Sequence, residues 1–329
     1  SRNSASSRAI PFEKMVKMVE EDPFIPIAWQ KDHKGMQGTE YFTDEKFRID
    51  IGDEFEYRED IQLATNEFKI RWFEAIDKAI NVAKGMNNLG LTKQLCNRLL
   101  EPFMWHTVLV TATEWDNFFE LRCPKYQTPV SRTVEPQRSW KDLLDVHSNP
   151  INEKLIIDNE NNWSFKMQYS LSSAEIHIQA LAEAMWDAMN ESTPKQLKAG
   201  EWHIPFRDKI NLTSLAAKPI EGLKNLCNFE IEGEQPATIK IATARCARLS
   251  YMTFDGEIDY EKDIKLHDQL LENKHMSPFE HVAKCMSEYE YGKFTKTYPT
   301  DNNGTFDEEE GWCNNFRGWI PYRYLVEHE

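Results

Sequence analysis

Hydroxyl, amide and guanidinium side chains crowd the first eight residues of the chain, SRNSASSR. Ser1, Asn3, Ser6 and Arg8 can all donate hydrogen bonds to phosphate oxygens, and an arginine can donate two of them in parallel. This composition favours a phosphate-binding role. The alternative is a frayed chain end, because serine-rich termini are usually poorly ordered.

Two further arginines stand on either side of a predicted strand at residues 106–113. Arg98 lies in a predicted helix before that strand, and Arg122 ends a predicted helix after it. Helices that flank one strand can bring both guanidinium groups to the same end of a sheet. The alternative is that both arginines are solvated and hydrogen-bond carbonyl groups at helix ends.

A third group of polar residues, nearer the end of the chain, could support acid–base chemistry. It comprises Arg248, Ser250, Glu280 and His281. Histidine titrates near neutral pH, so a Glu–His pair can exchange protons; a structural, hydrogen-bonding histidine is the alternative. His275 and His281 are not spaced like zinc ligands on a helix, so no metal site is expected.

Composition excludes several other classes of function. The thirteen glycines form no G-x-G-x-x-G motif, so a Rossmann domain is not expected. The six cysteines form no C-x-x-C pair, which indicates reduced thiols in a cytoplasm. A net charge of −15 disfavours nucleic acid as a partner. No apolar run could span a membrane and no signal peptide is visible, so a cytoplasmic protein without membrane contact is expected.

The elements that must position these residues are predicted from periodicity and capping. A short β-branched run predicts a buried strand at 106–113, and Ser172 or Ser173 is expected to cap one helix. Residues 241–251 fit either a helix or a strand, and 306–312 read as an acidic loop. Helices are predicted at 65–87, 91–100, 114–122, 172–190 and 257–273.

Residues 124–172 differ from the rest of the chain because they hold many Pro, Asn and Ser residues and little periodicity. They are interpreted as an insertion. No internal repeat or clear linker is present, so residues 1–329 are predicted to form a single domain with this insertion.

Several short segments together resemble the flavin-dependent thymidylate synthases, in the form that phages and some bacteria carry. SRNSASSR is similar to the second half of the family signature R-H-R-x-x-S-x-N-E-x-S-x-R, with Ser1, Asn3, Ser6 and Arg8 on its S, N, S and R. The other matching segments are NRLLEP, EWDNFFELR, AEIHIQALAEAM, ARLSY and HMSPFEH. The segments similar to ARLSY and HMSPFEH lie near the start of the common enzymes, whereas here they lie near the end of the chain. Phage-type members of the family share this permuted order.

The resemblance implies an α+β fold with an antiparallel or mixed sheet flanked by helices, assembled as a homotetramer with active sites between subunits. It implies methylation of dUMP to dTMP, with methylenetetrahydrofolate as carbon donor, NADPH as reductant and FAD as cofactor. Because reduced flavin supplies hydride after the uracil ring is activated, no cysteine nucleophile is needed.

The resemblance also implies roles for individual residues. Ser6 and Arg8 would bind the dUMP phosphate, and Arg98 would face the nucleotide. Arg122 would be the catalytic residue, because its cation can stabilise negative charge at N3 of the uracil. The flavin would be contacted by Asn3, Asn117, Ser250 and His281.

The chain departs from the family pattern at several points. The R-H-R triplet, which would grip the flavin, would precede Ser1, so an upstream segment or fragment that carries it is expected. Ser4 stands where the signature has Glu, and residues 124–172 lengthen a segment that is usually compact. Two alternatives stay open: a flavin and folate enzyme that hydroxymethylates a pyrimidine nucleotide, and a non-catalytic subunit that keeps the fold for assembly.

Overall fold

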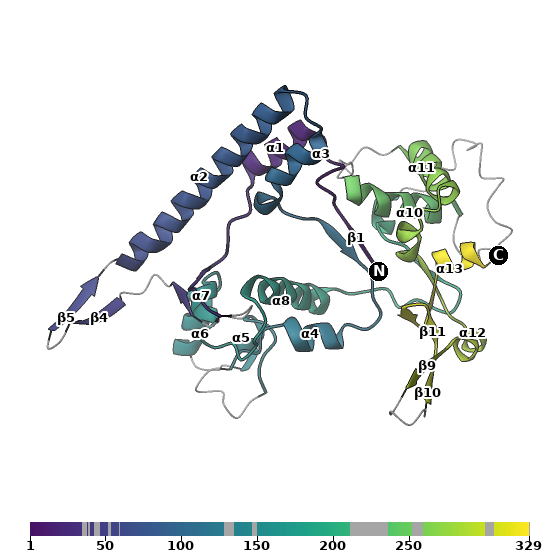
Figure 1. Cartoon of the computed structure of the whole chain (residues 1–329). Helices are drawn as coiled ribbons and strands as arrows, with labels where there is room; N and C mark the ends of the chain where they lie inside the picture. Colours follow the sequence, from purple (N-terminus) through teal and green to yellow (C-terminus); the bar gives the residue numbers. More distant parts are fainter. Residues whose placement is uncertain are drawn as a thin grey trace.

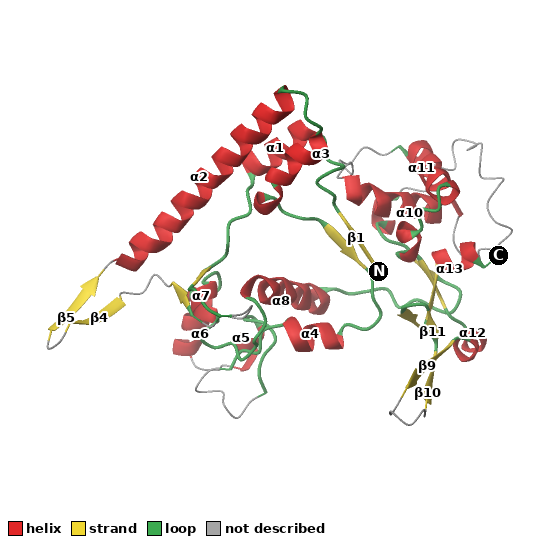
Figure 2. Cartoon of the chain, viewed as in Figure 1, coloured by secondary structure: helices red, strands yellow, loops and turns green. Residues whose placement is uncertain are grey.

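The structure is a computed structural model. It describes residues 1–34, 38, 40–42, 47–51, 54–58, 60–127, 135–146, 150–210, 236–251, 259–299 and 306–328. In these ranges helices alternate with short antiparallel strands, which confirms the α+β class (Figure 2).

The described α-helices differ widely in length, and none of them combines the length and apolarity needed to cross a bilayer. Short 3-10 helices are η1 (Asn97–Leu99), η2 (Glu101–Phe103), η4 (Arg207–Lys209) and η6 (Ser277–Glu280). The α-helices are α1 (Phe12–Glu21), α2 (Asp60–Asn88), α3 (Lys93–Cys96), α4 (Asp116–Arg122), α5 (Asp142–Val146), α6 (Pro150–Asp158), α7 (Trp163–Lys166), α8 (Ile176–Glu191), α10 (Pro236–Tyr251), α11 (Tyr260–Glu272), α12 (Glu288–Lys293) and α13 (Tyr322–Glu327).

The described strands form small sheets of two or three strands, so the expected sheet flanked by helices is divided into separate pieces here. The pairs are β1 (Arg2–Ser4) with β6 (Val108–Val110), β2 (Trp29–Gln30) with β3 (Tyr41–Phe42), β4 (Phe47–Ile51) with β5 (Glu54–Arg58), β9 (Thr295–Pro299) with β10 (Phe306–Glu310), and β11 (Trp312–Cys313) with β12 (Phe316–Arg317). The three-stranded sheet has the order β13 (Trp319–Pro321), β8 (Ala283–Cys285), β7 (Trp202–His203).

Three lobes are visible in Figure 1, formed around α1–α3, around α4 and α8, and around α10 and α11. In the first lobe α1 buries Phe12 and Met15 against Ile76 and Ile80 of α2, because each helix has one apolar face. The helix predicted at 65–87 is confirmed within α2.

The helix predicted at 91–100 is shorter than expected. Thr92 caps α3 by accepting from the N–H of Gln94, and the chain then tightens into η1 and η2. Pro102 stands at the start of η2, where the missing N–H costs nothing.

The strand predicted at 106–113 forms as β6, but it is not buried. Val108 and Val110 are each 44% exposed, since the described partner of β6 is the short strand β1 and the outward face stays open. The prediction of a buried strand is therefore wrong at these positions.

In the third lobe α10 is the central helix, and residues 237–247 are buried on every side. Residues 241–251 are therefore helical, which decides between the two predicted states. Ile239 and Ile241 pack with residues of α11 and η6, including Ile264 and Phe279.

Two local predictions are corrected by the structure. Residues 306–310 form strand β10 instead of an acidic loop, with Glu309 opposite Lys296 of β9. The cap of α8 is Glu175 and not Ser172 or Ser173, because the carboxylate of Glu175 accepts the first free N–H groups of the helix.

The described part of residues 124–172, the segment interpreted from the sequence as an insertion, has a small core of its own. It contains α5, α6 and α7, and its two ends meet: the N–H of Leu171 donates to the carbonyl oxygen of Lys125 at 3.0 Å. The core residues are Tyr126, Trp140, Leu143 and Ile156.

Candidate functional site

The opening segment is built into the fold and is not frayed. Asn3, at the centre of β1, is buried and donates from Nδ2 to the carbonyl oxygen of Cys246 at 3.4 Å. The hydroxyl of Ser277 donates to Oδ1 of Asn3. The N–H of Ala5 extends the pairing with β6 by donating to the carbonyl oxygen of Thr107 at 2.9 Å. Asn3 thus joins β1 to α10 and η6.

His281 lies at the same junction and is fully buried. Its Nδ1 is 2.8 Å from the hydroxyl oxygen of Thr111, directly after β6. Burial lowers the pKa of His281 to about 4; the Ser1 amino group and His203 act in the same direction, and Glu280 opposes them. The ring is therefore neutral at pH 7. Its Nε2 has no hydrogen-bond partner among the described residues, which makes this atom a candidate contact for a bound molecule.

The other members of the predicted acid–base group have structural contacts. Glu280 accepts a hydrogen bond from Nη1 of Arg323 at 2.6 Å, so it is paired with an arginine and not with its neighbour His281. Arg248 Nε donates to Oδ1 of Asp263 at 2.6 Å. Ser250 lies in α10, and its side chain is outside the described part of the structure.

Ser6 and Arg8 lie in a tight turn between β1 and α1, in which the N–H of Ala9 donates to the carbonyl oxygen of Ser6 at 2.9 Å. Ser6 is half-buried and Arg8 is exposed. The turn lies against η1, where Asn97 donates to its carbonyl oxygens, and Arg98 is the exposed residue that follows. The structure therefore brings Ser6, Arg8 and Arg98 to neighbouring elements.

Asn117 and Arg122 lie elsewhere, on α4, and both are exposed. α4 packs against α8 through Phe119, whose ring centroid is 5.2 Å from that of Trp186. Figure 1 shows α4 beside α8 and well away from α3. Within one chain, Arg122 and Arg98 therefore stay on separate lobes and do not meet at one end of a sheet.

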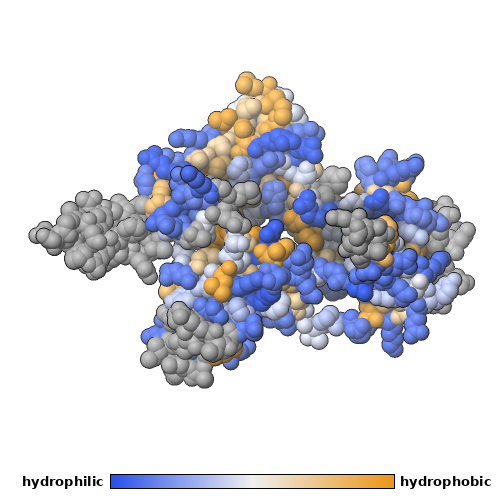
Figure 3. All heavy atoms as spheres, turned by 60° about the horizontal axis from the view of Figure 1, so that its bottom comes forward, coloured by the Kyte–Doolittle hydropathy of each residue, from blue (hydrophilic) through white to orange (hydrophobic). Residues whose placement is uncertain are grey.

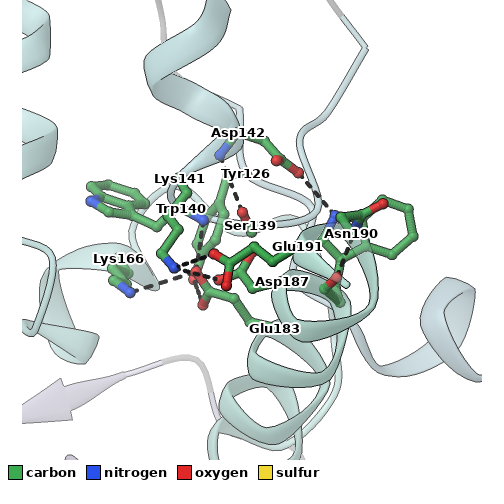
Figure 4. Close-up of polar contacts among 11 residues, drawn as sticks. Tyr126, Ser139, Trp140, Lys141, Asp142, Lys166, Glu183, Asp187, Asn190 and Glu191 are labelled. Carbon is green, nitrogen blue, oxygen red and sulfur yellow. Dashed lines mark hydrogen bonds and ion pairs between the residues drawn. The ribbon is translucent and has the colours of Figure 1, made fainter. Parts of the chain in front are cut away.

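A buried charged network joins the insertion to α8 (Figure 4). Nζ of Lys166 is 3.6 Å from Oε1 of Glu183, and the two side chains are 5% and 6% exposed. Glu183 also accepts from the hydroxyl of Tyr126 at 2.9 Å and from the N–H of Trp140 at 2.6 Å. Burial raises the pKa of Glu183 and lowers the pKa of Lys166. The charges of Lys166 and Glu183 and the hydrogen-bond donors around them are therefore paired with one another. We interpret the network as a structural link between residues 124–172 and α8 and not as a binding site.

Thiol and metal chemistry receive no support from the described residues. Burial raises the pKa of Cys123, Cys246 and Cys313 to about 12, so these thiols are protonated at neutral pH and are poor nucleophiles. No group of three His, Cys, Asp or Glu side chains that could hold a metal ion occurs in the described ranges.

The chain was compared with models of protein families, with curated proteins and with solved structures, and none of the three comparisons gave a match.

Sequence reasoning missed Asn97, Thr111 and Ser277 as members of this region. Asn97 and Ser277 stand inside the quoted segments NRLLEP and HMSPFEH, each next to residues chosen for chemistry. Their place inside these segments, next to residues already chosen, was the available signal. Thr111 had no such signal, because its partner His281 lies 170 residues further along the chain.

Proposed function

We propose that the chain is a subunit of an enzyme that methylates dUMP to dTMP with FAD, methylenetetrahydrofolate and NADPH, as its resemblance to the flavin-dependent thymidylate synthases implies. The main support is the ordered opening segment. Its signature residue Asn3 is fixed to α10 and η6, and the turn that carries Ser6 and Arg8 is fixed to η1. A chance run of serines at a chain end would not need such contacts.

The phosphate of dUMP would be bound by Ser6, Arg8 and Arg98. The two guanidinium groups are exposed, and the turn and η1 lie against each other. A phosphate carries charge that bidentate arginine contacts match in both geometry and sign. An acidic chain can therefore bind one nucleotide phosphate through a local group of cations.

The flavin contacts that the resemblance implies include Asn3 and His281, which lie at the junction of β1, β6 and η6. His281 is neutral and its buried Nε2 is unpaired among the described residues, so it can hydrogen-bond a ring atom without burying a charge. FAD, when bound there, would supply the hydride chemistry, while His281, Asn3 and Ser250 would hold and orient its ring.

Arg122 would reach the uracil from another subunit, and Asn117, also on α4, would contact the flavin there, because in the resembled family the sites lie between subunits. Once such an assembly excludes water, an arginine can stabilise negative charge on the ring strongly. Apolar side chains that could contact a second subunit gather over the end of α2 and α3 (Figure 3): Val82, Leu89 and Leu95 are 54%, 90% and 50% exposed.

The test is the visible absorption spectrum of the chain after dialysis with FAD, recorded with and without dUMP. The expected result is a retained flavin band that shifts when dUMP binds. Arg98→Ala is the matched variant: it should keep the band and lose the shift, because Arg98 would contact the nucleotide and not the flavin.

The same measurement is repeated after adding a segment that carries the R-H-R triplet. A folded chain that retains no flavin in either experiment would contradict the proposal and favour a non-catalytic assembly subunit. If flavin and dUMP both bind, the mass of the product separates methylation from hydroxymethylation.

A further inference from the structure

Asn97 is fully buried in η1, and both hydrogens of its side-chain amide are used on one turn. Nδ2 donates to the carbonyl oxygen of Ser7 at 2.6 Å and to the carbonyl oxygen of Ile10 at 2.9 Å. Its Oδ1 has no partner among the described residues. Burying this unpaired oxygen costs free energy that an apolar residue at position 97 would not cost. The gain that offsets this cost is the pair of hydrogen bonds that the Asn97 amide donates to the turn.

Two neighbours of Asn97 hold the same turn. Nζ of Lys93 donates to the carbonyl oxygen of Ala9 at 3.0 Å, and the carboxylate of Glu101 accepts from the hydroxyl of Ser7. Residues from one short segment therefore bind consecutive parts of the turn. Of these contacts, only those of Asn97 are shielded from water on both sides, which makes them the strongest constraint on the turn's position.

The turn and η1 are also the two places from which the proposed phosphate ligands emerge. Ser6 and Arg8 belong to the turn, and Arg98 follows Asn97 directly. One residue of η1 thus faces inward and fixes the turn, while the next faces outward. Any shift of the turn relative to η1 would change the spacing between the two guanidinium groups.

We infer that Asn97 is a positioning residue for phosphate recognition: it sets the distance between the Ser6–Arg8 turn and Arg98, so that all three side chains can contact one phosphate group. This inference rests on the proposed function. Side chains that are already in place need no rearrangement when the nucleotide binds. When groups that contact a substrate are misplaced by about 1 Å, the loss in reaction rate can reach about 100-fold.

The test compares the affinities of the FAD-loaded chain for dUMP and for deoxyuridine, which lacks the phosphate. In Asn97→Ala, the affinity for dUMP should fall by about 10- to 100-fold, and the affinity for deoxyuridine should change by less than about twofold. Asn97→Ser keeps one donor and should give an intermediate loss, which keeps the test available if the alanine variant does not fold. Ser7→Ala, which leaves the Ser7 carbonyl bound to Asn97, is the control and should retain most of the affinity.

The outcomes separate this inference from the proposed function. A wild-type chain that does not prefer dUMP over deoxyuridine overturns the proposed function and the inference with it. The inference alone is overturned if the wild-type chain prefers dUMP and the Asn97 variants keep this preference. It is also overturned if those variants lose the same factor of affinity for dUMP and for deoxyuridine.

Discussion

Acid should destabilise the fold through His281, which is fully buried. Burial, and then the nearby Ser1 amino group, lower its pKa from 6.5 to about 4. Between these two pH values the unfolded chain binds more protons at this residue than the folded chain does, so stability falls as the pH falls. The stabilisation that comes from a neutral, buried His281 is complete above pH 6.5 and is lost as the pH falls toward 4. The change in pKa corresponds to about 3 kcal/mol of unfolding free energy.

The assay is urea unfolding from about pH 7.5 to about pH 4, for the wild type and for His281→Asn. Asparagine does not titrate and can still hydrogen-bond Thr111. Burial also lowers the pKa of His203 and His267, but both proteins contain these residues, so the difference between the two curves isolates His281. Over this range the wild type should lose about 3 kcal/mol relative to the variant. Parallel curves would refute the reasoning, because they would mean that residue 281 is not buried as a neutral ring.

Further predictions concern single substitutions. Arg122→Ala should leave the unfolding free energy within about 0.5 kcal/mol, because the residue is exposed. Under the proposed function it should lower dTMP formation by about 100-fold, and equal turnover would contradict the catalytic role proposed for it. Glu183→Gln should cost about 3–5 kcal/mol in urea unfolding by leaving Lys166 buried and unpaired, and adding Lys166→Met should restore much of it. Gly311→Ala should cost about 1–3 kcal/mol, since its φ is +85° and a Cβ would overlap the ring of Tyr291; an unchanged melting temperature would contradict this.

The long helices could be predicted because their signal is local. Residues 65–87 and 257–273 repeat apolar positions at helical spacing, and the structure has α2 and α11 there. Part of the candidate site could also be predicted from the sequence. Asn3 and His281 were both chosen there, and in the structure they lie at one junction. Whether 1–329 is a single domain stays a prediction.

What could not be predicted depends on partners distant in sequence. β10 is a run of acidic residues with no apolar alternation, and it becomes a strand only because β9 offers a partner, with Lys296 opposite Glu309. Asn97 and Ser7 are separated by 90 residues, so no local pattern shows that their contact fixes a turn. The separation of Arg98 from Arg122 follows in the same way from the packing of α4 on α8, which the spacing of the two arginines does not encode.

The insertion leaves and rejoins the chain at one place, because Lys125 and Leu171 are hydrogen-bonded to each other. Residues between these two points can therefore be shortened or replaced while the ends that continue into α4 and α8 stay close together. Glu183, however, belongs to α8 and has its charge matched by Lys166 inside the insertion. A shortened chain that joins Lys125 directly to Leu171 would leave Glu183 without the cation that matches it, so the segment and that carboxylate must be changed together.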